Sequence, residues 1–322
     1  MSRTLGVDLG TSTILVYAPR KGIVIREPSV IAVEREGGKI LALGAQAEAM
    51  LGRTPDGITA AQPVRAGAVA DYALYAAMLS GFVQKLCRHR LTKPDLLLAV
   101  PASITKLEEH AVLEAAAQAG ARRVQLVESV LAAAVGAQVD FSRPEGKMVV
   151  DIGGGTTDIG VLSLGAVVVR ESVRVGGESF DEALARYVRA QKKLLIGAKL
   201  ASDAKMQVGC ICPRPEEKSI RLRGRDLGGS AVGECELRSG QCIRPFAEPG
   251  GRIAEGIAAV LEKTPPELAA DISKNGIVLT GGGSLLWGMD EFILRATGIR
   301  AHLADDPASC VALGLGKLAE TR

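Results

Sequence analysis

Two short glycine bends, each led by an aspartate and set between β-branched residues, constrain this 322-residue chain more than any other feature. The first is VDLGTST, residues 7–13, and the second is VDIGGGTT, residues 150–157. The flanking valine and isoleucine residues favour strands on both sides of each bend. Because glycine has no Cβ atom, a ligand or another piece of backbone can approach closely. The repeat indicates an internal duplication, with two unrelated hairpin turns as the alternative.

The chain between the two bends alternates between strand-like and helix-like patterns. Residues 96–100, LLLAV, are typical of a short buried strand. A capping box at Thr105 and Glu108 then opens an alanine-rich helix that stops near Gly120, and a second strand follows at 124–128. This order predicts a mainly parallel sheet with helices on its faces, and it starts again after the second bend. The length favours two domains.

The bends are suited to binding phosphate. Glycines followed by Thr or Ser present backbone N–H groups and hydroxyls to one concavity, and two such bends could grip a polyphosphate from both sides. Asp8 and Asp151 would repel bare phosphates, but a Mg²⁺ ion, bound mostly through water, resolves that repulsion. Turn capping by the aspartates and local hydrogen bonds of the hydroxyls are the alternative explanation. A third turn, LTGGGSLLWG at 279–288, places bare backbone where a base or sugar could pack.

Other classes of protein are disfavoured. The chain has neither a P-loop nor the G-x-G-x-x-G turn of dinucleotide folds. The net charge of +3 and 3% aromatic residues imply no nucleic-acid partner. No signal peptide or spanning segment is expected, so we expect a cytoplasmic protein. A zinc site is disfavoured, because C-x-C and C-x6-C is not a standard ligand spacing; buried or half-buried thiols are the preferred interpretation for Cys210, Cys212, Cys235 and Cys242.

The motifs carry a family resemblance. DLGT, DIGGGTTD and LTGGGSLL, in this order, are similar to the phosphate 1, phosphate 2 and adenosine motifs of the actin, heat-shock chaperone and sugar kinase superfamily. Longer segments resemble the MreB family of bacterial rod-shape proteins: REPSVIAV, EAMLGRTPDGITAAQPVRAGAVADY, VVDIGGGTTDIGVLSLG, LEKTPPELAADI and GIVLTGGGSLLWGMD. The resemblance runs from about residue 5 to 320.

The resemblance implies an actin-like α/β fold: two duplicated α/β domains, each with a smaller inserted subdomain, and a nucleotide cleft between them. We expect domain I at 1–138, with an insert at about 30–66 and completion by a C-terminal helix at 309–322. We expect domain II at 139–308, with an insert at about 181–242.

The resemblance also implies a site for ATP with Mg²⁺. The residues expected at the phosphates are Gly10, Thr11, Ser12 and Thr13 from one domain and Gly153, Gly154, Gly155 and Thr156 from the other. Those expected at the adenosine are Gly282, Gly283, Ser284 and Leu285, with Ser202 and Lys205 beside the ribose. Ser202 replaces an acidic residue of the family, which would weaken the contact to a ribose hydroxyl.

One departure from the family concerns hydrolysis. The family has Glu-Glu-Pro where this chain has Glu128-Ser129-Val130, and the second glutamate is thought to place the attacking water. Serine can hold a water molecule but cannot take its proton near neutral pH. The candidate catalytic residues are therefore Ser129, Thr156 and Glu128, and Glu128 could act only if the backbone has already turned into the next helix.

The resemblance implies filaments of identical subunits at the inner membrane surface that organise cell-wall synthesis with elongation proteins. The opposing filament ends would include 57–67 and 210–242. We expect the chain to enter its first strand directly, without the N-terminal amphipathic anchor of some relatives. The basic turn at 86–95 could contact anionic headgroups, with an ordinary solvated loop as the alternative. A non-hydrolysing scaffold or an accessory paralogue is the alternative function, and a small-molecule kinase is disfavoured because no segment supplies a substrate pocket.

Overall fold

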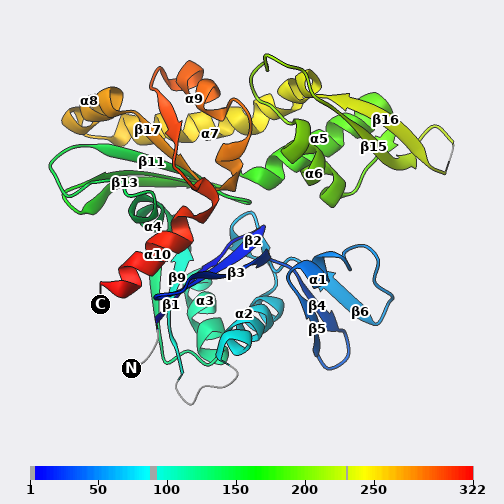
Figure 1. Ribbon diagram of the computed structural model, residues 1–322, viewed down its shortest axis with the longest axis horizontal. Helices are drawn as coiled ribbons and strands as arrows, with labels where there is room; N and C mark the ends of the chain where they lie inside the picture. The colour runs from blue at the N-terminus through cyan, green and yellow to red at the C-terminus, as the bar shows by residue number, and fades with distance from the viewer. Residues whose placement is uncertain (1–3, 88–92, 230, 322) are drawn as a thin grey trace.

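Two five-stranded sheets of the same topology form the centres of the two halves of the molecule (Figure 1). The computed structural model describes residues 4–87, 93–229 and 231–321. The first sheet has the order β3-β2-β1-β9-β10, with β1 (Thr4–Leu9), β2 (Thr13–Ala18), β3 (Gly22–Pro28), β9 (Asp95–Val100) and β10 (Arg123–Glu128). The second has the order β13-β12-β11-β17-β18, with β11 (Lys147–Ile152), β12 (Thr157–Ser163), β13 (Ala166–Val173), β17 (Ile277–Thr280) and β18 (Ala301–Leu303).

Both sheets are built in the same way, which confirms the duplication. In each sheet the leading strand, β1 or β11, pairs antiparallel with the next strand and parallel with a strand from much later in the chain. The prediction of mainly parallel sheets was wrong, because each sheet also contains a three-stranded antiparallel part. The reason is that each bend joins its strands as a tight hairpin, which only antiparallel neighbours allow.

Helices cover both sheets and bury separate cores. The helices packed beside the first sheet are α2 (Tyr72–Cys87) and α3 (Lys106–Gln118), and those beside the second are α7 (Ile243–Lys263), α8 (Pro266–Asn275) and α9 (Met289–Thr297). The predicted capping box of α3 is confirmed, since the Thr105 side chain accepts from the Glu108 N–H at 3.2 Å and Glu108 accepts from the Thr105 N–H at 2.8 Å.

Two helices fill the junction between the halves. They are α4 (Ser129–Gly136), which packs on β11 and β12, and α10 (Cys310–Glu320), which packs on β1 and β2. The two helices also pack tightly on each other (Figure 1). A third apolar core, which includes Val130, Val149 and Leu315, lies between them and the sheets. The C-terminal helix therefore returns to the first half of the molecule.

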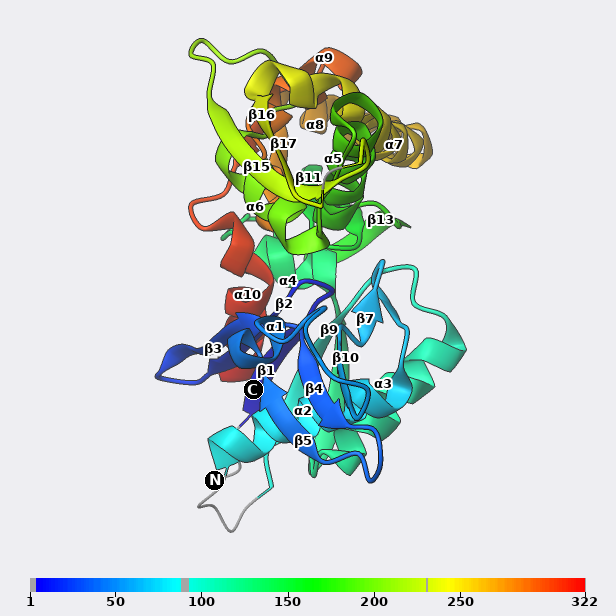
Figure 2. The same ribbon diagram turned by 90° about the vertical axis from the view of Figure 1, so that its right-hand side faces the viewer.

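Each half carries a smaller unit, and the two units lie on the same side of the molecule (Figures 1 and 2). The first contains β4 (Ile31–Glu34), β5 (Ile40–Leu43), α1 (Ala45–Glu48) and β6 (Ile58–Ala61), followed by the hairpin β7 (Val64–Arg65) and β8 (Ala68–Val69). The second contains α5 (Gly177–Lys192), β14 (Leu194–Leu195), α6 (Ala198–Val208), β15 (Ser219–Asp226) and β16 (Gly233–Arg238). We propose the domain limits given above, because both small three-stranded sheets, β5-β4-β6 and β14-β15-β16, fall inside the expected inserts.

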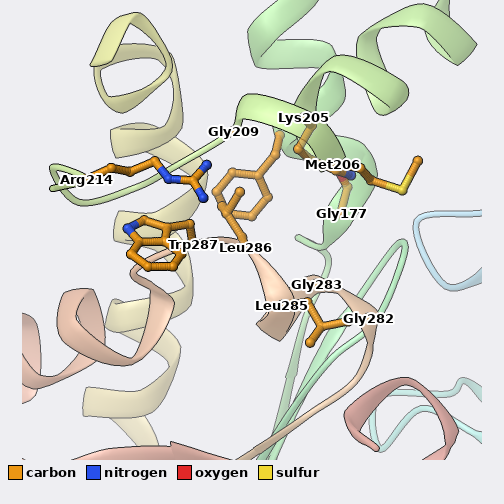
Figure 3. Close-up of a pocket in the computed structure, with 11 residues that line it drawn as sticks. Gly177, Lys205, Met206, Gly209, Arg214, Gly282, Gly283, Leu285, Leu286 and Trp287 are labelled. Carbon is orange, nitrogen blue, oxygen red and sulfur yellow. The ribbon is translucent and has the colours of Figure 1, made fainter. Parts of the chain in front are cut away.

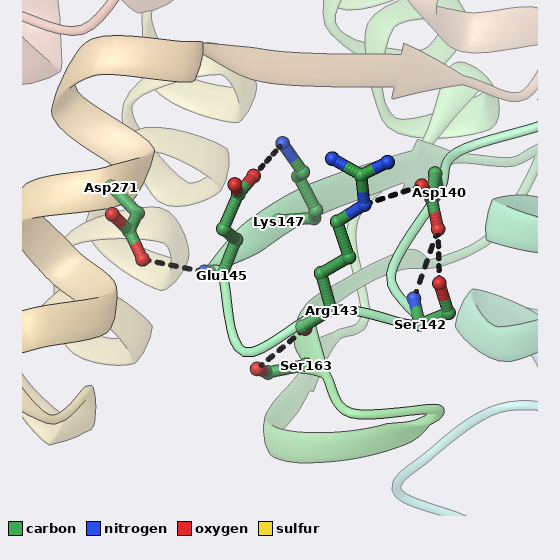
Figure 4. A network of polar contacts seen from close by, with 8 residues as sticks. Asp140, Ser142, Arg143, Glu145, Lys147, Ser163 and Asp271 are labelled. Carbon is green, nitrogen blue, oxygen red and sulfur yellow. Dashed lines mark hydrogen bonds and ion pairs between the residues drawn. The ribbon is translucent and has the colours of Figure 1, made fainter.

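A polar network holds the chain where it crosses from α4 to β11 (Figure 4). Arg143 lies 3.6 Å from Asp140, and its carbonyl oxygen accepts from the Ser163 hydroxyl at 3.4 Å. The Gly146 N–H donates to Asp271 of α8 at 2.9 Å. These contacts fix the connection between the halves at the side remote from the small units.

The clustered cysteines have no metal-site arrangement. Cys210, Cys212 and Cys242 are buried and Cys235 is half-buried, as predicted, and all four thiols are free. Within the described residues, no group of three or more His, Cys, Asp and Glu side chains is placed to hold a metal ion. Over the same part of the chain, no helix combines the length and apolar character needed to cross a bilayer.

Candidate functional site in the cleft between the halves

The two glycine bends have the same internal structure. In the first, which joins β1 to β2, the Gly10 N–H donates to the Thr13 carbonyl oxygen at 3.0 Å. In the second, which joins β11 to β12, the Gly153 N–H donates to the Thr156 carbonyl oxygen at 2.8 Å. Gly10 and Gly153 are thus equivalent residues, and each closes its bend with a hydrogen bond to the carbonyl oxygen three residues later.

The bends face each other in direct contact. A Cβ atom added to Gly154 would lie 2.1 Å from the Ser12 hydroxyl oxygen, and one added to Gly155 would lie 2.3 Å from the Thr11 hydroxyl oxygen. Glycine is required at both positions because any side chain would push the bends apart. The two halves therefore meet at these bends, beside a cavity of about 370 Å³.

Most of the residues predicted from the sequence line this cavity. They are Asp8, Gly10, Thr11, Ser12, Thr13, Ser129, Asp151, Gly153, Gly154, Gly155, Thr156, Ser202, Lys205, Gly282 and Gly283. Leu285 lines an adjoining pocket. Two predicted residues lie outside both linings. Ser284 is buried and its hydroxyl donates to the Gly281 carbonyl oxygen at 2.6 Å, while Glu128 points elsewhere.

The strand-to-helix junction decides between Glu128 and Ser129. β10 ends at Glu128 and α4 begins at Ser129. Glu128 is therefore still part of the strand, and its side chain does not enter the cavity. Its carboxylate instead lies 3.4 Å from Arg170 of β13. Ser129 is 9% exposed and lines the cavity. Of the three candidate catalytic residues, Ser129 and Thr156 thus line the cavity and Glu128 does not.

Three carboxylates converge in the cavity. Burial, together with the nearby Asp158 charge, raises the pKa of Asp8 to about 7. Burial likewise raises the pKa of Asp151 to about 7, although the Thr280 hydroxyl donates to it at 2.6 Å. The pKa of Asp158 is raised to about 6, again mainly by burial.

These raised pKa values mean that the ionised carboxylates lack counter-charge. A divalent cation would supply it, and Asp8 and Asp151 could hold one through water. Because the described residues do not form a cation site by themselves, the remaining ligands would be phosphate oxygens and water. The donor set therefore fits Mg²⁺ that arrives with a polyphosphate.

Lys205 of α6 is fixed at the wall of the cleft. Its Nζ donates to the Gly177 carbonyl oxygen at 2.8 Å and lies 2.9 Å from the Asp181 carboxylate. Asp181 is largely buried, and this burial raises its pKa. Ser202 and Asp181 both line the cavity, so an acidic side chain lies close to Ser202.

An apolar pocket of about 350 Å³ adjoins the main cavity (Figure 3). Met206 and Leu286 line it together with the glycine turn at 282–283. Trp287 closes one side, and the Arg214 guanidinium lies 4.5 Å from the centre of its ring, a cation–π arrangement. A flat apolar group such as a nucleobase fits between such walls.

The lining residues that the sequence-based set did not include have among them Gly67, Asp158 and Asp181. Gly67 lies at the tip of the β7–β8 hairpin, and its N–H donates to the Thr11 hydroxyl at 3.0 Å. The Ala-Gly pair between valines was a usable hairpin signal, and Asp158 was visible at the end of the second bend. Asp181 gave no signal, because its position depends on how α5 packs against α6.

The fold and the site together define an actin-like protein, with two duplicated α/β halves that meet at paired glycine bends. Comparison with known proteins specifies the family. The family model described as MreB/Mbl protein matches residues 2–322, and the chain belongs to this family.

Individual relatives agree with this assignment. The chain is 42% identical over 325 residues to the cell shape-determining protein MreB of Escherichia coli (strain K12), with 99% of this chain and 94% of the relative covered. The crystal structure of MreB5 of Spiroplasma citri bound to ADP has a TM-score of 0.94 at 32% identity, with coverage of 100% and 97%. The MamK double helical filament has a TM-score of 0.82 at 22% identity, with 99% of both chains covered, and supports the fold alone.

Proposed function

We propose that this protein is a nucleotide-dependent, filament-forming actin homologue that takes part in determining cell shape. The observation that carries the proposal is the direct contact of two equivalent glycine bends, one from each half, beside three convergent carboxylates. Membership of the MreB/Mbl family and the ADP bound to the related MreB5 support ATP as the ligand.

The lining residues have separate roles in this proposal. The backbone N–H groups and hydroxyls of the two bends would bind the phosphates, and Asp8 and Asp151 would hold Mg²⁺ through water. Mg²⁺ would neutralise the phosphate oxygens. The base enters the apolar pocket beside Leu285, and Lys205 with Ser202 lies at the ribose. Because both halves touch one ligand, occupancy of the cleft sets the angle between them.

Filament formation follows if that angle controls the head-to-tail contact between subunits. A head-to-tail contact that does not close into a ring produces an open polymer. The test is sedimentation with ATP, with ADP, with a non-hydrolysable ATP analogue and without nucleotide. We expect the amount of pelleted protein to depend on nucleotide. The proposal would be refuted if none of the three nucleotides changed the sedimentation of the protein and none bound to it in calorimetry.

A glycine pair supplies a matched control. A Cβ atom at Gly155 would also lie 2.7 Å from the Gly67 backbone nitrogen, whereas one at Gly251 in α7 meets nothing within 4 Å. Gly155→Ala should therefore weaken nucleotide binding and pelleting, and Gly251→Ala should leave both unchanged.

Slow hydrolysis is part of the proposal. Ser129 lines the cavity without a carboxylate, so phosphate release should be well below that of a Ser129→Glu variant. Equal rates in the two proteins would show that another group already orients the water as well as a glutamate at position 129 would. The absence of any turnover, with filaments still formed, would favour the second candidate function, a non-hydrolysing scaffold or accessory paralogue.

We also propose that the filaments lie at the inner face of the membrane and contact cell-wall elongation proteins, as the family resemblance implies. The basic turn at 86–95 is the candidate contact, although residues 88–92 lie outside the described part of the chain. Co-sedimentation with anionic and with zwitterionic liposomes, followed by electron microscopy, tests this point. Binding to neither kind of liposome would refute it.

A further inference from the structure

Asp158 is the carboxylate best placed to substitute for the glutamate that Ser129 replaces. It is 2% exposed and lines the same cavity as Ser129 and Thr156. It comes from β12, at the far end of the second glycine bend, where it pairs across the sheet with Asp151. The other nearby acidic residue, Glu128, faces Arg170 outside the cavity.

Three neighbours hydrogen-bond to the Asp158 side chain: Ala102 from the first half of the molecule, and Thr156 and the cross-strand residue Ser172 from the second. The Ala102 N–H, from the loop after β9, donates to Oδ1 at 3.1 Å. The Thr156 hydroxyl donates to Oδ2 over 3.4 Å, which is a long contact. A carboxylate has about four acceptor positions, so these three donors leave Asp158 capacity for about one more.

We propose that Asp158 positions the attacking water for hydrolysis of the terminal phosphate, in the place of the glutamate that Ser129 replaces. The inference rests on the proposed function, since it assumes that ATP occupies the cleft. Oδ2 accepts a hydrogen bond from the water, and the hydroxyls of Ser129 and Thr156 complete its surroundings. Phosphoryl transfer needs little covalent help from the protein, so a residue that orients the nucleophile can be sufficient.

The step is balanced without further reactants. The water oxygen forms a bond to the γ-phosphorus while the bond from that phosphorus to the β,γ-bridging oxygen breaks. ADP leaves with the bridging oxygen and its electron pair. One water proton stays on the attacking oxygen and the other passes to a phosphoryl oxygen, so the products are ADP and dihydrogen phosphate.

The hydrogen bond from the Ala102 N–H links the orientation of Asp158 to closure of the cleft. It crosses the cleft, because Ala102 belongs to the first half and Asp158 to the second. Opening of the cleft would release Oδ1 and let the carboxylate turn away. Water positioning is thus coupled to closure of the two halves around the nucleotide.

The test is single-turnover phosphate release by Asp158→Asn, with ATP affinity and thermal stability measured on the same protein. The amide oxygen of the introduced asparagine can still accept from the Ala102 N–H, so a purely structural role would survive this change, whereas the amide nitrogen cannot accept from water. We expect the rate to fall about 10²-fold, as for loss of an oriented catalytic group, with affinity within about two-fold of the original. Adding Ser129→Glu to the Asp158→Asn variant should restore turnover.

Glu128→Gln is the comparison variant, and it should change the rate far less than Asp158→Asn does. Four outcomes would overturn the inference: an Asp158→Asn variant that hydrolyses normally, loss of turnover in Glu128→Gln, a large change in ATP affinity or Mg²⁺ requirement on Asp158→Asn, or a parent protein that forms nucleotide-dependent filaments without turnover. The last leaves the proposed function intact. Failure of the parent protein to bind ATP would instead remove the proposed function as well.

Discussion

The contact between α4 and α10 gives the sharpest prediction about stability. A Cβ atom added to Gly314 of α10 would lie 1.8 Å from the Ala132 carbonyl oxygen of α4. Real Cβ contacts do not fall below 3.0 Å, so the helices would have to separate by 3.0 − 1.8 = 1.2 Å at this point. Both atoms belong to helix backbones or are attached directly to them, so no flexible side chain can absorb the shift.

We expect Gly314→Ala to lower the free energy of unfolding by about 2 kcal/mol. Overpacking costs about 1–3 kcal/mol or more, and the better helix propensity of alanine offsets at most about 1 kcal/mol. The measurement is denaturant unfolding followed by circular dichroism. Because α4 begins at Ser129, we also expect slower phosphate release from the variant.

Gly251→Ala is the control for helix propensity. Gly251 also lies inside a helix, but its added Cβ atom meets nothing within 4 Å, so this variant should be more stable by about 0.5–1 kcal/mol. The expected result is that Gly314→Ala lowers the free energy of unfolding and Gly251→Ala raises it. A Gly314→Ala protein as stable as Gly251→Ala would show that α4 and α10 separate at no cost, which would refute the reasoning.

Three further predictions concern the cleft. Lys199 and Glu48 form an ion pair of 3.3 Å that joins the two small units. Reversing either charge should speed nucleotide release up to about five-fold, which corresponds to about 1 kcal/mol. Reversing both charges should restore the original rate, and a stopped-flow exchange assay measures all three variants. Trp287 is the only tryptophan of the chain, so its fluorescence should change when ATP binds, and an unchanged signal would place the base elsewhere. Ala66 has a φ of 46°, a backbone conformation that asparagine tolerates better than alanine does. Ala66→Asn should therefore raise the free energy of unfolding by up to about 1 kcal/mol, measured by thermal or denaturant unfolding. A less stable variant would contradict this prediction.

The sequence by itself determined the duplicated fold and the two glycine bends that line the cavity. These features depend on local chemistry: glycine is needed wherever backbone approaches backbone, β-branched runs form strands, and a capping box starts a helix at Thr105. Such signals are complete within a few consecutive residues. The bends at 10–13 and 153–156 could therefore be recognised without coordinates.

Only the tertiary structure decided which of the remaining acidic side chains reach the cavity. Glu128 is excluded because α4 begins one residue later and Arg170 attracts its carboxylate. Asp158 is oriented by an N–H group that lies 56 positions away in the chain. Contacts of this kind depend on how the two halves pack together, and no pattern within a short segment encodes that packing.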